Sequence, residues 1–92
     1  MKVSFYATLR RIVGAKTVDV PLPEGASVRD LVDAIIRRHP DLEPLLLDEA
    51  GLPRRGVHVF VNGRGAGYLA RGFDTPLAAS DTVDVFPAVA GG

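Results

Sequence analysis

The segment SVRDLVDAIIRRHP at residues 27–40 constrains the fold most, because it is the one strong helical pattern in 92 residues. Its apolar side chains recur at the spacing of a single helix face. They are Val28, Leu31, Val32, Ile35 and Ile36. Ser27 is a suitable N-cap, and Asp30 favours the positive end of the helix dipole. The basic residues and proline at 37–40 suit the other end.

The segment before this helix alternates apolar and polar residues, which is the period of half-buried strands. One strand is predicted over residues 2–7 and a second over 16–21, joined as a hairpin by a turn near Gly14. Their inward side chains are expected to be Val3, Phe5, Ala7, Val18 and Val20. The helix would cover one face of the sheet that these strands begin.

The second half of the chain predicts further strands. Residues 57–61 and 82–86 alternate, and Asn62-Gly63 between them is a strong hairpin signal. Residues 41–56 suggest a short turn tucked under the domain and then an exposed loop, and 68–73 suggest a short edge strand. Strand, strand, helix and further strands together predict an α+β fold, with a mixed sheet packed on one main helix.

Composition excludes several classes of function. Eleven basic and eleven acidic residues cancel, so the broad cationic field of a nucleic-acid binder is missing. Without cysteine there is no disulfide, thiolate zinc site or cysteine nucleophile. No apolar run approaches the roughly 20 residues of a membrane span. We therefore expect a complete, cytoplasmic protein that binds neither nucleic acid nor membrane.

Few residues suggest catalysis. His39 and His58 fall on unrelated elements without metal-ligand spacing, so no metal site is predicted. The glycine-rich run at 63–67 lacks the helix and the Lys-Ser/Thr of a phosphate loop, and we interpret it as turn structure. We expect a protein that is not an enzyme on its own.

Three aromatic side chains that point outward give the clearest indication of a binding surface. Strand alternation places Tyr6, Phe60 and Phe86 on the sheet face away from the helix, where polar residues are usual. Each could bury about 150 Å², so together they would supply roughly half of the ~800 Å² that one side of a standard interface buries. They predict a partner-docking surface. The alternatives are that loops or a second copy cover the rings, or that Phe60 faces the other way.

The last eight residues, VFPAVAGG, suggest an extended arm. Pro87 has a fixed φ and biases Phe86 toward an extended conformation, so the strand should end there. Gly91 and Gly92 lack a Cβ and can thread a narrow channel. The carboxylate of Gly92 would need conversion to a mixed anhydride, such as an acyl adenylate, before sulfur or an amine could attack it. The alternative is a frayed tail.

Nearly the whole chain resembles the ubiquitin-like sulfur carriers of the MoaD/ThiS type, typified by the small subunit of molybdopterin synthase and the sulfur carrier of the thiamine pathway. The matching segments are KVSFYATLRRIVG, LPEGASVRDLVDAI and FDTPLAASDTVDVFPAVAGG. The resemblance implies a β-grasp domain at 1–86 and a tail at 87–92. It departs from the molybdopterin carriers at Ala88, where they typically have a second proline, and at Arg11, where they have glutamate.

The resemblance also implies a mechanism. A ubiquitin-activating-type enzyme would use ATP to adenylate Gly92, and sulfur transfer would leave a thiocarboxylate there; the carrier itself would bind no cofactor. The tail would thread the active site of the molybdopterin synthase large subunit, or of another sulfur-accepting enzyme, and the domain would dock on it. The threading residues are Pro87, Ala88, Val89, Ala90 and Gly91. The docking residues are Tyr6, Arg10, Phe60 and Phe86.

Molybdenum cofactor biosynthesis is the first pathway that the resemblance suggests. PAVAGG is also similar to the tail of a sulfur carrier in cysteine biosynthesis, so cysteine or another thio-metabolite is a second destination. The longer middle of the chain resembles archaeal small modifier proteins, which serve both as sulfur carriers and as protein conjugates, so conjugation to lysines is a further alternative. A plain interaction domain with an incidental tail is the remaining alternative.

Overall fold

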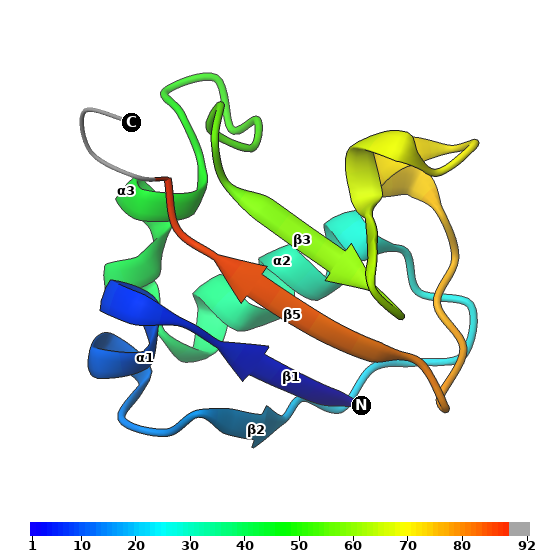
Figure 1. The fold of residues 1–92 in the computed structure, drawn as a ribbon, viewed down its shortest axis with the longest axis horizontal. Coiled ribbons are helices and arrows are strands. Elements are labelled where there is room, and N and C mark those ends of the chain that lie inside the picture. The colour runs from blue at the N-terminus through cyan, green and yellow to red at the C-terminus, as the bar shows by residue number, and fades with distance from the viewer. Residues whose placement is uncertain (89–92) are drawn as a thin grey trace.

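The computed structural model describes residues 1–88, and its strands form one five-stranded sheet (Figure 1). In chain order the elements are β1 (Lys2–Phe5), α1 (Ala7–Val13), β2 (Thr17–Asp19), α2 (Val28–Arg38), η1 (Pro40–Leu42), α3 (Glu43–Leu46), β3 (His58–Val61), β4 (Arg64–Gly65), η2 (Ala66–Tyr68), η3 (Gly72–Asp74) and β5 (Thr82–Phe86). The strand order is β2-β1-β5-β3-β4. β1 and β5 pair in parallel and the other neighbours are antiparallel, so the predicted mixed sheet is confirmed.

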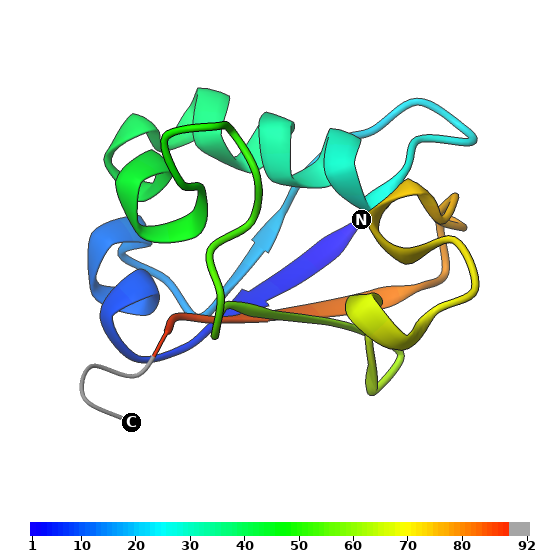
Figure 2. The same cartoon turned by 90° about the horizontal axis from the view of Figure 1, so that it is seen from above.

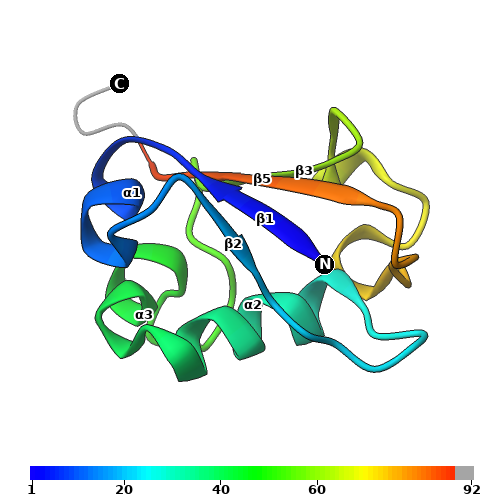
Figure 3. The same cartoon turned by 90° about the horizontal axis from the view of Figure 1, so that it is seen from below.

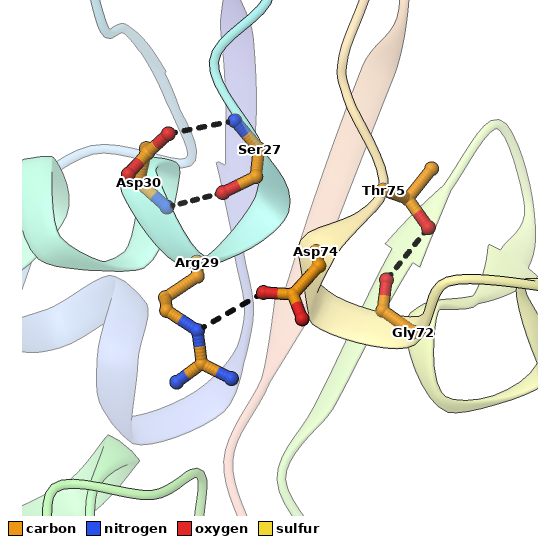
Figure 4. Close-up of polar contacts among 6 residues, drawn as sticks. All are labelled: Ser27, Arg29, Asp30, Gly72, Asp74 and Thr75. Atoms are coloured by element: carbon orange, nitrogen blue, oxygen red, sulfur yellow. Dashed lines mark hydrogen bonds and ion pairs between the residues drawn. The ribbon is translucent and has the colours of Figure 1, made fainter.

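The predicted helix is α2, and it lies with α3 on one side of the sheet (Figures 2 and 3). Its start is a reciprocal capping box (Figure 4). Asp30 N–H donates to Ser27 Oγ at 3.1 Å, and Ser27 N–H donates to Asp30 Oδ2 at 2.9 Å. These two bonds satisfy backbone donors that the first turn of a helix leaves free.

The core lies between α2 and the sheet and consists of apolar side chains. Its largest fully buried members are Val3, Phe5, Leu9, Val28, Leu31, Ile35, Leu42, Val83 and Val85. Each of β1, β3 and β5 alternates buried and less buried positions, so the period of 2 seen in the sequence is the period of burial. The opposite side chains of the same strands therefore form the second face of the sheet.

The first predicted hairpin is wrong in its connection. Ala7 does not continue β1: it is exposed and begins α1, which separates β1 from β2. Ala7 has a φ of 54°, in the left-handed region, and this turns the chain out of the strand at once. Gly14 ends α1 with a φ of 84°, so the glycine that suggested a hairpin turn is a helix C-cap.

The prediction for residues 41–56 is confirmed: η1 and α3 are short helical turns that bury Leu42 and Leu46, and a mostly exposed loop follows. One further segment differs from the prediction. Residues 68–73 do not form an edge strand: they contribute to two 3₁₀ turns, and the edge strand is β4. Arg29 Nε donates to Asp74 Oδ1 at 3.4 Å, which links η3 to the start of α2 instead of to the sheet. Thr75 Oγ1 donates to the Gly72 carbonyl at 2.7 Å and closes the η3 turn itself (Figure 4).

The Asn62-Gly63 hairpin is confirmed. The two residues have φ of 51° and 82°, the left-handed pair that a type I′ turn requires, and Val61 pairs with Arg64 across it. The glycine-rich run is thus the turn plus β4 and the start of η2. The last strand ends at Phe86 as predicted. The division into a domain at 1–86 and a tail at 87–92 stays a prediction.

Candidate docking face and C-terminal arm

Tyr6, Phe60 and Phe86 lie together on the sheet face opposite α2, and we call these three side chains the aromatic face. β1 and β5 are parallel, so Tyr6 and Phe86 both come at the carboxyl ends of neighbouring strands. Their rings stack with centroids 4.1 Å apart and planes 12° apart. Phe60 meets Phe86 edge-on at 5.5 Å. The predicted placement of the three rings on one face is confirmed.

The contacts among the rings also limit what they can offer a partner. All three are half-buried, because each already covers part of its neighbour. The area available for docking is therefore well below the ~450 Å² that three free rings would supply. A standard interface must draw the rest from residues around the aromatic face.

Polar groups surround Tyr6. Its hydroxyl donates a 2.8 Å hydrogen bond to Asp84 Oδ1, on the outward side of β5. This hydrogen bond raises the pKa of the Tyr6 phenol, with smaller contributions from desolvation and from the negative charge of Asp84. Lys16 Nζ lies 5.8 Å from the Tyr6 ring centroid, within the range of a cation–π contact. Tyr6 is thus held neutral and in a fixed orientation.

A basic edge borders the aromatic face at α1. Arg10, Arg11 and Lys16 line a shallow hollow there, and all three are exposed. The predicted docking residue Arg10 therefore belongs to this edge and not to the group of rings. At the other border, the His58 ring lies 5.9 Å from Phe60.

Three neighbours of the rings were not predicted as part of the site. Strand alternation places Asp84 and His58 on the outward side, each on a strand face with a predicted ring, but gives no sign of their contacts. Lys16 had no such signal, since its position depends on α1, which the sequence did not reveal.

The C-terminal arm, which is the predicted tail at residues 87–92, begins where β5 ends. Pro87 is half-buried and Ala88 is exposed. The other predicted tail residues, Val89, Ala90, Gly91 and Gly92, lie outside the described residues. Within residues 1–88, no three His, Asp or Glu side chains gather as a possible metal site. No helix in that same part of the chain is long and apolar enough to cross a membrane.

The contacts of the aromatic face suit recognition. Rings, a neutral phenol and exposed cations can bury area and match charge on another protein.

Comparison with known proteins places this geometry among ubiquitin-like chains. The model of the ThiS family matches residues 3–92. Small archaeal modifier protein 1 of Haloferax volcanii is 35% identical over 92 residues, all of both chains. Its crystal structure, compared at 32% identity, has a TM-score of 0.86 and covers 100% of this chain and 98% of that one.

Two other solved structures carry different names. A chain of the Amycolatopsis orientalis BexX/CysO complex has a TM-score of 0.78 at 32% identity, covering 99% of this chain and 98% of that one. A Pyrococcus furiosus protein, described as a candidate molybdopterin converting factor subunit 1, has a TM-score of 0.75 at 36% identity. The match covers 96% of this chain and 95% of that one. These matches over nearly full chains confirm the predicted β-grasp fold.

Proposed function

The chain belongs to the ThiS family, and from that premise we propose that it is a sulfur carrier whose terminal carboxylate, on Gly92, is adenylated and converted to a thiocarboxylate. One observation carries the proposal: Phe86 is both the central ring of the aromatic face and the last residue of β5 before the arm. A partner that docks on the face would therefore hold the origin of the arm. Docking and delivery of the carboxylate would be one event.

The chemistry proceeds in two displacements. A carboxylate oxygen of Gly92 attacks the α-phosphorus of ATP on the activating enzyme, and pyrophosphate leaves. A sulfur nucleophile at the oxidation level of sulfide then attacks the glycine carbonyl. A carbon–sulfur bond forms, the bond to AMP breaks, and AMP leaves with its electron pair. A glycine carbonyl suits this attack because it has no Cβ beside it.

Docking uses the aromatic face and the basic edge together. The rings supply a hydrophobic anchor of the kind that dominates interface energies. Arg10 and its neighbours add charge complementarity, which favours a partner with acidic groups beside an apolar patch. The residues from Pro87 to Gly91 then thread the partner's active site. The ATP belongs to the activating enzyme, and the carrier needs no cofactor of its own.

The destination of the sulfur is a narrower proposal. Similarity to the P. furiosus protein supports a role as the small subunit of molybdopterin synthase, with Gly92 entering the large subunit. Similarity to the BexX/CysO chain supports another sulfur-accepting enzyme equally well. Molybdenum cofactor biosynthesis is therefore one of the two destinations of the sulfur that these similarities support.

A second function is favoured by the similarity to small archaeal modifier protein 1. In this case the ε-amine of a target lysine, in place of sulfur, displaces AMP from the activated Gly92 and forms an isopeptide bond. Both functions use the same adenylate, so they can coexist in one protein.

Co-expression with the activating enzyme and a sulfur source tests the carrier function. Intact mass measurement should show one terminal oxygen replaced by sulfur, located at Gly92 by fragmentation. A variant lacking Gly91 and Gly92 is the control and should stay unmodified. Full activity of every partner with that truncated variant, and no sulfur on the intact chain, would overturn the proposal. Isopeptides ending in Gly92 on cellular proteins would establish the modifier function.

A further inference from the structure

The loop before β3 runs beside the first residues of the arm. His58 pairs with Phe86 in the antiparallel register of β3 and β5. Extending that register by two residues sets Gly56 opposite Ala88. Figure 1 shows the end of β5 beside the segment that leads into β3. Pro87 lacks an N–H, so the backbone ladder cannot simply continue between them.

Gly56 and Ala88 are in close contact. A Cβ built on Gly56 would lie 3.3 Å from the Cβ of Ala88 and 3.6 Å from its Cα. Gly56 also has a φ of 90°, which side chains other than glycine rarely adopt. A side chain at Gly56 would therefore crowd Ala88, which would have to move by a few tenths of an ångström.

The loop that carries Gly56 is anchored to the domain. Arg54 Nε donates to the Pro44 carbonyl at 2.7 Å, and Arg54 N–H donates to the Leu46 carbonyl at 2.8 Å. Val57 N–H in turn donates to the Arg54 carbonyl at 3.1 Å. Because α3 contains both Pro44 and Leu46, these hydrogen bonds attach the turn at residues 54–57 to α3.

We propose that Gly56 is a positioning residue for the arm: its bare α-carbon, held by the turn at 54–57, receives Ala88 and sets the direction in which the chain leaves the sheet. This inference rests on the proposed function. The four residues that follow Ala88 must bring one carboxyl carbon to a partner's reactive atoms, where small errors of placement slow chemistry steeply. The small side chain of Ala88 matches the space that Gly56 leaves.

Gly56→Asn tests the proposal, since asparagine tolerates a left-handed backbone better than other side chains. Gly51→Asn is the matched control: Gly51 has a φ of 79° in the same loop region, and its Cβ would meet nothing within 4 Å. We expect Gly56→Asn to lower kcat of adenylation by the activating enzyme about tenfold with KM unchanged, because the aromatic face is intact. Gly51→Asn should leave both constants as in the wild type.

Ala88→Gly added to Gly56→Asn should restore much of kcat, because it removes the side chain that the new Cβ meets. Equal kcat in the Gly56→Asn and Gly51→Asn variants would overturn the inference. In the wild type, NMR should show a nuclear Overhauser effect between the Ala88 methyl group and the Gly56 α-protons, and its absence would also overturn it. A wild-type chain that shows this contact but is never adenylated would instead contradict the proposed function.

Discussion

At the scale of single residues, Phe86 links the docking of a partner to the delivery of the Gly92 carboxylate. Its ring stacks on Tyr6 and meets Phe60 edge-on, while its carbonyl leads into Pro87. Pairs of this kind contribute about 0.5 to 1.5 kcal/mol each beyond the area they bury. The ring is nevertheless outside the main core, so its loss should affect binding more than folding.

Phe86→Ala should weaken binding to the activating enzyme by about 1 to 3 kcal/mol, because it removes the central ring of the aromatic face. Calorimetry of the purified pair measures this directly. Phe73→Ala is the contrasting control: Phe73 packs against the core, so it should lower the free energy of unfolding and leave affinity unchanged. If Phe86→Ala lost stability but bound normally, the ring would have a structural role only.

The titration of Tyr6 reports on its bond to Asp84. The folded-state pKa of Tyr6 is raised, so the stabilisation from this group is present below its unfolded pKa of about 10 and is lost as pH rises through the folded pKa. Asp84→Asn should lower the Tyr6 pKa, because the negative acceptor is gone. Phenolate absorbance measures it, in a Tyr68→Phe background that leaves one tyrosine. An unchanged titration after Asp84→Asn would contradict the hydrogen bond.

At the scale of elements, the two helices flanking β2 show what the sequence can and cannot reveal. α2 has eleven residues, an apolar stripe and a capping box, and the residue types along its sequence indicate each of these features. α1 has seven residues, no side-chain cap and no acidic residue in its first turn. Its start depends on the left-handed Ala7, which no local pattern indicates. Tertiary contacts, such as the burial of Leu9, hold it instead.

Ser27→Ala should destabilise the domain by about 1 kcal/mol, the usual cost of losing an N-cap. The Ser27 hydroxyl accepts a hydrogen bond from Asp30 N–H, and in the variant that N–H could bond only to water. Denaturant unfolding followed by circular dichroism gives the difference. Ser80→Ala is the control, since Ser80 is exposed and lies outside any helix. Equal unfolding free energies for the two variants would show that the capping box is not stabilising.

At the scale of the whole molecule, the site is assembled by strand order. Alternation predicted which face each ring occupies, since that period does not depend on topology. The Tyr6–Asp84 bond needs the parallel pairing of β1 with β5, and the contact of Gly56 with Ala88 needs the antiparallel pairing of β3 with β5. Pairings between segments far apart in the sequence carry no local signal. The faces were therefore predictable, and the contacts across strands were not.

Trapping the activated carboxyl group tests the adenylation of Gly92 directly. The purified chain is incubated with its activating enzyme and ATP, hydroxylamine is added, and the products are fragmented in a mass spectrometer. We expect an ATP-dependent hydroxamate on the carboxyl carbon of Gly92, and none in the chain lacking Gly91 and Gly92. A chain that binds the enzyme but gives no hydroxamate at Gly92 would contradict the proposed adenylation.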